Sequence, residues 1–392
     1  QILSIVHLGM EAFEEIIGKV VSTVAFVLRN AIVKGYRITG IRLVDYYDSH
    51  RWEKETQFFN KEHYYQHTTN SFYSNIHGSP IAYWAGEKIK NVFEKGLSLK
   101  KYYDVKSGIM TGNDNRFLRL WHEVSLNKIG FNLSSYSQFI DSKKKWFPIN
   151  KGGELKKWYG NNFFIVNLFD NGREIKESGG NFRLREPKYY FKEGITWSRV
   201  TSADISFRFV PSGMVFGDAG PMIFISKEDK YFHHCLGMLC SKISSKLLKI
   251  INPTLNYQVR DIGNLPFIVE KKCNNDKLKE LVEKCITISI TDWDSYETSW
   301  DFKKHPFLTY RGEAKTLEVC YANWADHAEK QFRQLQKNEE ELNRIFIELY
   351  GLQDELRPEV PDEEVTIRRA DRVRDAKSFL SYCVGLMMGR FS

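Results

Sequence analysis

The sequence lacks the patterns that mark secreted, membrane-spanning and disulfide-rich proteins. It has only six cysteines in 392 residues, and because no two form a CxxC pair, neither a zinc knuckle nor a disulfide framework is indicated. No stretch approaches the roughly 20 apolar residues that cross a bilayer, and the N-terminus has no secretory signal pattern. A reducing compartment fits these features best. We therefore expect a cytoplasmic protein that does not associate with membranes.

The common catalytic signatures are also missing. The sequence has no glycine-rich phosphate loop, Walker motif, GxSxG elbow or HExxH zinc helix. The arrangement closest to a metal site combines His233–Cys235 with Cys240, but adjacent histidines point in different directions on a helix. We expect an ordinary helix surface there and no bound metal. Asp294–Glu297 is interpreted as a helix start with an acidic first turn rather than as part of a catalytic carboxylate pair.

The low proline content and nearly balanced charge indicate a globular chain. There are 10 prolines, and 57 basic against 49 acidic residues give a formal charge of +8. A chain of this length supports two or three domains. The charge is mild, so it permits an anionic partner without requiring one. Aromatic residues make up 14% of the chain, more than a core needs, and many carry a polar tip suited to a wet binding surface.

Three apolar runs near the N-terminus predict strands. They cover Ile2–Leu8, Val20–Leu28 and Arg37–Val44. A strand that starts at the first residue needs neighbours to cover it. We therefore expect this chain to be the remainder of a larger protein in which the start of an α/β sheet precedes Gln1.

The middle of the chain predicts a mixed α/β region. A polar, aromatic-rich segment from 45 to 78 has no steady period and is interpreted as a linking segment. Further on, short strand-like runs such as Phe163–Leu168 and Met222–Ile225 alternate with glycine-rich connections. The apolar spacing of Tyr231–Ile251 predicts one amphipathic helix, which Asn252-Pro253 ends.

Long helices are predicted beyond Asp276. From Leu317 to Leu349, apolar residues recur every three or four positions, a pattern that needs an apolar stripe inside a helical hairpin or bundle. Gly351 ends this stripe. The run Ala376–Met388 indicates a further helix.

Three strings that mix polar, basic and aromatic residues are the strongest functional signals. Gly108–Phe117 places amide, hydroxyl and guanidinium groups in a glycine-flanked turn, where they can approach phosphates or base edges, although a polar turn without function is an equal reading. Lys143–Tyr159 interleaves ammonium groups with rings, as a nucleic-acid groove does. Arg183–Arg208 supplies arginines suited to guanine edges. The candidate DNA-binding residues are Thr111, Asn113, Asn115, Arg116, Lys143, Lys144, Lys145, Lys151, Lys156, Lys157, Trp158, Arg183, Arg185, Arg199 and Arg208.

A set of longer strings is spread along the chain. It comprises His7–Glu14, Ser79–Trp84, Gly108–Phe117, Lys145–Tyr159, Gly194–Ser198, Asn252–Asn256, Thr298–Phe302 and Asn338–Leu356. Together they resemble PglX, the family of adenine-specific DNA methyltransferases of BREX phage-exclusion systems, across nearly the whole chain. That family is akin to the gamma-class amino-methyltransferases and to type IIG restriction-modification enzymes. A type IIG fragment stays an alternative because those enzymes share several of the strings.

The resemblance implies methyl transfer from S-adenosylmethionine to adenine N6 in duplex DNA, after the base is flipped out of the stack. The family's cofactor-binding glycine-rich loop and its Asn-Pro-Pro-Tyr motif precede the strand that matches Ile2–Leu8, and neither occurs in this chain. We therefore expect no complete catalytic site here and S-adenosylmethionine binding only in the intact protein. The implied partner is double-stranded DNA, and other BREX proteins or phage-encoded inhibitors are further implied partners.

One residue of the methyl-transfer pocket is implied by the resemblance. In gamma-class enzymes an aromatic residue follows a short Leu-Gly turn, ahead of the penultimate strand of the catalytic sheet, and packs against the flipped adenine. Leu8-Gly9 followed by Phe13 matches that arrangement. The alternative is that Phe13 is an ordinary core residue under the strand Val20–Leu28.

The resulting expectation is an α/β plus α fold with three parts. Residues 1–45 are expected to be terminal strands of a Rossmann-like methyltransferase sheet, 46–270 a linker with a mixed α/β DNA target-recognition domain, and 271–392 a helical C-terminal domain. The expected function is DNA target recognition within a site-specific adenine-N6 methyltransferase of phage defence. One alternative is a non-enzymatic nucleic-acid-binding module, but such a module has no need of the strands in residues 1–45. A protein-interaction scaffold built on the helix at 317–349 would bind no DNA, which a salt-dependent binding assay would reveal.

Overall fold

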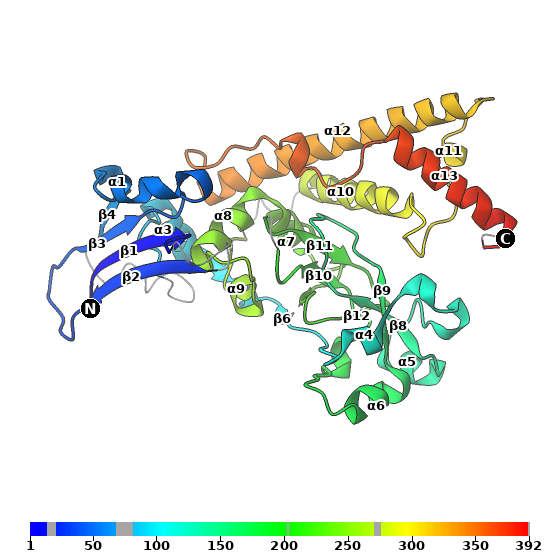
Figure 1. Ribbon diagram of the computed structural model, residues 1–392, viewed down its shortest axis with the longest axis horizontal. Coiled ribbons are helices and arrows are strands. Elements are labelled where there is room, and N and C mark those ends of the chain that lie inside the picture. Colours follow the sequence, from blue (N-terminus) through cyan, green and yellow to red (C-terminus); the bar gives the residue numbers. More distant parts are fainter. Residues whose placement is uncertain (14–20, 68–80, 202–203, 270–275, 391–392) are drawn as a thin grey trace. The chain divides into compact units, whose positions relative to one another are not determined.

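The computed structural model describes residues 1–13, 21–67, 81–201, 204–269 and 276–390. The chain divides into two compact units, which are coloured along the sequence in Figure 1. The first unit contains residues 1–97 and 250–252, and the second contains 98–249 and 253–392. Within the described residues the fold is mixed α/β, with several small sheets and a helical C-terminal region.

The first unit is built on a four-stranded sheet. Its strands are β1 (Ile2–Met10), β2 (Ser22–Leu28), β3 (Ile38–Arg42) and β4 (Tyr64–His67), in the order β2-β1-β3-β4. β1 runs antiparallel to β2 and parallel to β3, and β4 runs antiparallel to β3. The three predicted strands are confirmed. β4 lies in the segment interpreted as a linker, so that interpretation is corrected: part of the segment extends the sheet.

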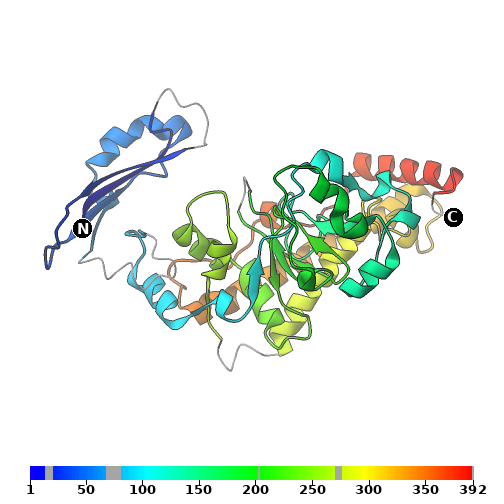
Figure 2. The same ribbon diagram turned by 90° about the horizontal axis from the view of Figure 1, so that it is seen from below.

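Helical turns accompany this sheet. They are η1 (Asp48–Glu53), α1 (Lys54–Phe58) and η2 (Lys61–His63), and Figure 2 shows η1 and α1 against one face of the strands. α3 (Glu87–Lys95) follows further along the chain. Tyr83 belongs to the core of this unit, where its hydroxyl donates to the carbonyl of Ile41 at 2.9 Å. A Cβ on Gly40 would lie 2.2 Å from the Tyr83 ring, so only glycine fits at this point of β3.

The second unit contains two four-stranded sheets. One has the order β11-β10-β13-β6, and the other has the order β12-β8-β9-β7. Large side chains, among them Phe147, Phe191 and Phe216, pack in one core drawn from both sheets. The strands are β6 (Asp104–Lys106), β7 (Leu118–Leu120), β8 (Trp146–Asn150), β9 (Phe164–Asn167), β10 (Gly194–Trp197), β11 (Phe207–Val210), β12 (Val215–Phe216) and β13 (Met222–Phe224).

Short elements precede, connect and follow these strands. Three of them border the candidate site: α4 (Asp114–Phe117), α5 (Tyr136–Ser142) and α6 (Phe169–Glu177). The others are β5 (Leu97–Ser98), η3 (Leu99–Lys101), η4 (Trp121–Glu123), η5 (Leu126–Lys128), η6 (Pro187–Tyr189), α9 (Val259–Gly263) and β14 (Pro266–Phe267).

The segment predicted as one amphipathic helix forms two. α7 (Phe232–Cys240) and α8 (Lys242–Ile251) are separated at Ser241, whose φ of −83° and ψ of 166° are extended. The first backbone N–H of α8, that of Lys242, donates to Asn343 Oδ1 at 3.0 Å. A residue in a distant part of the chain therefore accepts a backbone N–H at the start of α8 that has no partner within the helix.

The C-terminal helices confirm the predicted periodic pattern. α10 (Asp276–Asp294), α12 (Leu317–Tyr350) and α13 (Arg372–Met387) are joined by α11 (Pro306–Thr309) and η8 (Asp362–Glu364). Gly351 ends α12 in the left-handed region at φ 69°, as predicted. The helix start predicted at Asp294–Glu297 is wrong, because Asp294 is the last residue of α10 and its Oδ1 accepts from Ser299 Oγ at 2.7 Å.

Candidate nucleic-acid interface

A group of cationic side chains, which we call the lysine cluster, surrounds the ends of β8 and β9. Its members are Lys128, Lys143, Lys144, Lys145 and Arg173. Lys145 Nζ pairs with Glu174 Oε1 at 2.9 Å, and Asn167 Nδ2 donates to the other carboxylate oxygen at 3.1 Å. The hydrogen bond from Lys145 is the main cause of the lowered pKa of Glu174, to which the positive charge of Arg116 also contributes. The lysine cluster therefore brings cationic groups from three separate segments of the chain together with one carboxylate, that of Glu174.

The turn at Gly108–Phe117 is held by its own side chains. Asn113 Oδ1 accepts the backbone N–H of Arg116 at 3.1 Å and so caps α4. The buried Thr111 hydroxyl donates to Asp114 at 2.6 Å, and Lys151 Nζ pairs with that carboxylate at 2.6 Å. Burial opposes ionisation of Asp114, but these two contacts hold its pKa below the usual value. Thr111, Asn113 and Lys151 thus shape the turn.

Residues 112–116 of this turn are exposed, and the Asn113 and Asp114 side chains are engaged within it. Asn115 and Arg116 are exposed on α4. The backbone carbonyl of Asn115 accepts from Arg119 Nη1 at 2.7 Å, which fixes the peptide and leaves the amide side chain available. These are the groups of the turn best placed to reach a ligand.

A second group, which we call the arginine cluster, consists of Arg183, Arg185 and Arg199 around Asp218. Arg199 Nη1 contacts Asp218 Oδ2, and the Ser107 hydroxyl donates to the other oxygen. Arg185 Nε donates to the carbonyl of Gly108 at 2.9 Å. Burial, followed by the charge of Arg183, lowers the pKa of Arg185, while Asp218 opposes that shift. The backbones of Arg183 and Met110 hydrogen-bond to each other in both directions, so the turn is joined to this cluster.

Besides Thr111, Trp158 and Arg208 are buried, and the side chains of Lys156 and Lys157 are only 13% and 15% exposed. Lys156, Lys157 and Trp158 contact the C-terminal helical region. Lys157 Nζ pairs with Glu339 Oε2 at 2.6 Å, and Trp158 Nε1 donates to Oε1 of the same carboxylate at 2.8 Å. Lys156 Nζ donates to the carbonyl of Thr366 at 2.6 Å and lies 3.4 Å from Asp292. No local pattern in the sequence indicates these partners, because Glu339 lies far along the chain.

Burial affects the two lysines differently. It lowers the pKa of Lys156, and Asp292 only partly opposes this shift. For Lys157, burial is outweighed by Glu339, so its pKa is raised. In both cases the ammonium group is engaged within the protein, so we assign neither lysine a contact with nucleic acid.

Arg208 is buried, and within the part of the chain that the structure describes it forms no hydrogen bond with the C-terminal helices. Its side chain is fully buried, and burial lowers its pKa to about 10. Nη1 lies 3.5 Å from the carbonyl of Lys156, and among the described residues Nε and Nη2 have no hydrogen-bond partner. A guanidinium in this position cannot reach an external base edge.

Phe13 lies at an exposed position in the first unit. Its side chain is 52% exposed, so the described residues do not bury it in a core. Gly9, at φ 73°, is required in the preceding turn because a Cβ there would lie 2.8 Å from Val44 Cα. Glu11 Oε2 accepts the backbone N–H of Asp48 at 2.6 Å. The turn that carries Phe13 is therefore fixed at both of these residues.

The histidine–cysteine arrangement does not form a metal site. The expectation of an ordinary helix surface is corrected, because Cys235 is fully buried while His233 Nε2 contacts Glu283 at 2.7 Å. Burial also raises the pKa of the Cys235 thiol. Within the described part of the chain, no three His, Cys, Asp or Glu side chains are grouped so as to hold a metal ion. In the same part, no helix has the length and apolar character of a membrane span.

Sequence comparison identifies the relatives of this chain. It is 39% identical over 406 aligned residues to the adenine-specific methyltransferase PglX of Lacticaseibacillus casei (strain Zhang), covering 100% of this chain and 33% of that protein. The chain is homologous to PglX/BrxX adenine-specific methyltransferases over its whole length. A second relative is the adenine-specific methyltransferase BrxX of Escherichia coli O9:H4 (strain HS), which is 32% identical. That alignment covers 100% of this chain and 32% of BrxX. The chain thus spans about a third of both.

Two further comparisons add little. No family model matches the chain. The structure of the type IIL restriction-modification enzyme MmeI in complex with DNA is similar at a TM-score of 0.35 and 12% sequence identity. The alignment covers 71% of this chain and 35% of the MmeI chain. A similarity of this size supports no conclusion about function.

Proposed function

We propose that this chain is the DNA target-recognition portion of a site-specific DNA adenine-N6 methyltransferase that acts in bacterial phage defence. The observation that carries the proposal is the whole-chain homology to two adenine-specific methyltransferases. The lysine and arginine clusters supply the cationic groups that such a portion needs.

The proposal assigns roles to the three parts of the chain. Residues 1–45 are the last strands of a Rossmann-like catalytic sheet, 46–270 include the target-recognition domain, and 271–392 brace it. The contacts of Lys157 and Trp158 with Glu339 support the bracing role, because they tie the second string to α12. In the intact protein, Phe13 stacks against the flipped adenine, a role that its exposure permits.

S-adenosylmethionine is the methyl donor of the proposed intact protein. The described residues of this chain do not fit the cofactor: the carboxylate nearest the end of β1, Glu11, already accepts the Asp48 N–H, and the chain contains no glycine-rich cofactor loop. We therefore assign cofactor binding and methyl transfer to other parts of the protein.

The test is the salt dependence of binding to a DNA duplex. Affinity should fall steeply with salt, because each phosphate contact releases counterions. Changing Lys143 and Lys144 together to alanine should reduce the slope of log affinity against log salt by up to about two. Lys145 contributes less, because Glu174 already neutralises it.

A matched control removes the same charge elsewhere. Lys279 and Lys315 are exposed on the C-terminal region, and their double alanine variant should keep the wild-type slope. Equal slopes for all three proteins would exclude the lysine cluster from the interface, and a lack of binding to any duplex would refute the proposed function.

A further inference from the structure

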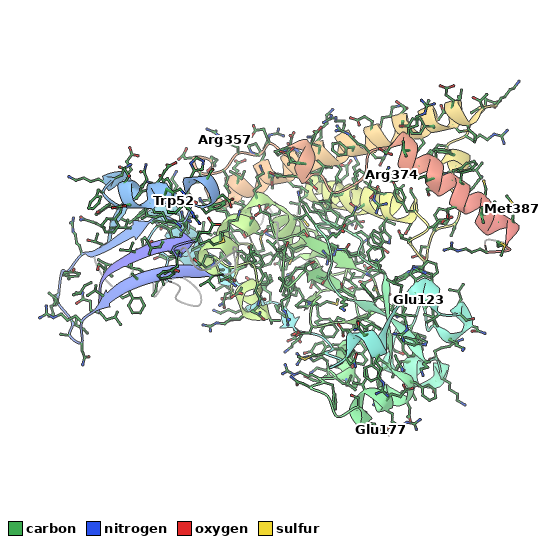
Figure 3. All side chains as sticks on the ribbon, in the orientation of Figure 1. Trp52, Glu123, Glu177, Arg357, Arg374 and Met387 are labelled. Carbon is green, nitrogen blue, oxygen red and sulfur yellow. The ribbon has the colours of Figure 1, made fainter. Side chains whose placement is uncertain are left out.

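Two adjoining hollows open beside the lysine cluster, between α5 and the start of α6. Their volumes are about 410 and 450 Å³, and both are lined by Lys143, Lys144, Phe169 and Arg173. Figure 3 shows the side chains of this region, with Glu177 marking the end of α6. The two hollows are therefore neighbouring parts of one site.

The first hollow is strongly cationic. Lys128, Lys143, Lys144, Lys145 and Arg173 line it, whereas Glu174 supplies its one carboxylate. That carboxylate is engaged by Lys145, and Arg173 Nη1 lies 2.9 Å from Asp170. Positive charge remains in excess after these pairs are formed, which is the condition for binding a phosphate.

The second hollow has an apolar wall beside a polar one. Phe139, Ile140, Leu168 and Phe169 form the apolar wall, and the remaining lining residues are Lys143, Lys144, Asp170, Asn171 and Arg173. Phe139 and Leu168 are buried, whereas Ile140 is 49% exposed and Phe169 is 38% exposed. Exposed apolar groups directly beside unneutralised ammonium groups form a surface that a planar ring can cover.

The walls of the hollows have an unusual backbone. Lys143 on one wall and Asp170 and Asn171 on the other have φ values of 51°, 49° and 56°, a region that residues with a Cβ rarely adopt. Gly172 follows at φ 74°, where a Cβ would lie 2.9 Å from Leu184. Asn167 Oδ1 accepts the backbone N–H of Phe169 at 3.2 Å. Strained conformations of this kind concentrate at ligand-binding sites.

We propose that the two hollows receive one unstacked nucleotide of the bound DNA. Its phosphate lies in the first hollow between Lys143, Lys144 and Arg173, and its base lies in the second against Phe169 and Ile140. This inference rests on the proposed DNA-binding function and adds a second kind of contact, to an unpaired base. The required ligand chemistry is that of a nucleoside phosphate, which a DNA strand or a free mononucleotide can provide.

The experiment compares three duplexes of one sequence: fully paired, with one extra unpaired nucleotide, and with an abasic residue in place of that nucleotide. The full chain should bind the bulged duplex between about five- and a hundredfold more tightly than the paired one, the range expected for stacking one base. The abasic duplex should lose this preference, because it keeps the phosphate and lacks the ring.

Two substitutions at one position connect the preference to the site. Phe169→Ala should remove the preference while leaving the affinity for the paired duplex within about twofold, since stacking is the lost contact. Phe169→Trp should keep the preference, because a ring face remains. The matched control is Leu126→Ala, which shortens an apolar side chain that is 61% exposed and lines neither hollow. Thermal unfolding of each variant shows that it is folded.

The outcomes separate this inference from the proposed function. The nucleotide site is refuted if the chain binds paired duplex with steep salt dependence but does not prefer the bulged duplex. It is also refuted if the Phe169→Ala variant keeps that preference. In both cases the DNA-binding proposal stands. If no duplex binds, the proposed function fails. If deoxyadenosine monophosphate binds in a Phe169-dependent way and the bulge is not preferred, the assignment to a DNA strand is overturned in favour of a free nucleotide.

Discussion

At the scale of single residues, His305 is a buried group whose protonation opposes folding. It is 2% exposed, and its Nδ1 accepts the backbone N–H of Phe307 at 3.2 Å, capping α11. Burial lowers its pKa to about 4, although the nearby Asp375 opposes the shift. Protonation would remove the acceptor and place an additional charge in a buried site.

The sign of the resulting pH dependence follows from this lowered pKa. The unfolded chain takes up the proton near pH 6.5 and the folded chain only near 4. The stabilisation is therefore complete above about pH 6.5 and falls as the pH drops towards 4, on the order of 3 kcal/mol in total. Urea unfolding at pH 7 and pH 4.5 measures it. The variant His305→Asn keeps a capping acceptor, so its free energy of unfolding should fall less over this pH range than that of the wild type. An identical fall in both proteins would show that His305 is not the source of the pH dependence.

Phe13 is the second residue with a specific expected role. Stacking of a base on an aromatic ring contributes roughly 1 to 3 kcal/mol, whereas truncating a buried phenylalanine destabilises a protein by roughly 3 to 5 kcal/mol. In the full-length protein, Phe13→Ala should therefore slow adenine methylation and change the melting temperature by only a few degrees. Phe13→Trp should keep part of the activity. A large loss of thermal stability with normal methylation by the folded fraction would show that Phe13 is a core residue.

At the scale of elements, the contact between α12 and the segment 156–158 depends on one buried carboxylate. Glu339 is 3% exposed and binds both Lys157 and Trp158. Glu339→Gln would leave the Lys157 charge buried without a counterion, which destabilises a protein by roughly 3 to 5 kcal/mol. Urea-induced unfolding at neutral pH gives the value.

The same helix offers a matched control. Asp326 pairs with Lys330 at 2.6 Å, and both side chains are exposed. Asp326→Asn should change the free energy of unfolding by less than about 1 kcal/mol, because solvent weakens an exposed pair. Equal effects of the two substitutions would show that the buried contact does not hold α12 to the segment.

At the scale of the whole molecule, DNA binding and methyl transfer should be separable. The chain spans about a third of its methyltransferase relatives and contains no Asn-Pro-Pro-Tyr run. We expect calorimetric titration of the isolated chain with S-adenosylmethionine to give no binding heat, and incubation with duplex DNA and the cofactor to give no N6-methyladenine. Duplex binding should persist in the same preparation. Micromolar cofactor binding by the chain alone would contradict this division.

The sequence by itself determined those features that depend on neighbouring residues. Apolar runs predicted β1, β2 and β3, and three- and four-residue spacing predicted α12 and its end at Gly351. A periodic pattern is local, so it can be read directly from the chain. The homology that the strings indicated is likewise a property of sequence alone, and comparison confirmed it.

The tertiary structure alone decided which cationic residues are available. Composition placed Lys143 and Lys157 in one string, but the latter is neutralised by a carboxylate 182 positions away. The break at Ser241 likewise coincides with a contact from Lys242 to Asn343, 101 positions away. The hollows near Phe169 were not predicted, because α5 and α6 meet only in the folded chain. Burial and ion pairing depend on distances in space, and local sequence does not determine which distant groups come within a few ångströms of one another.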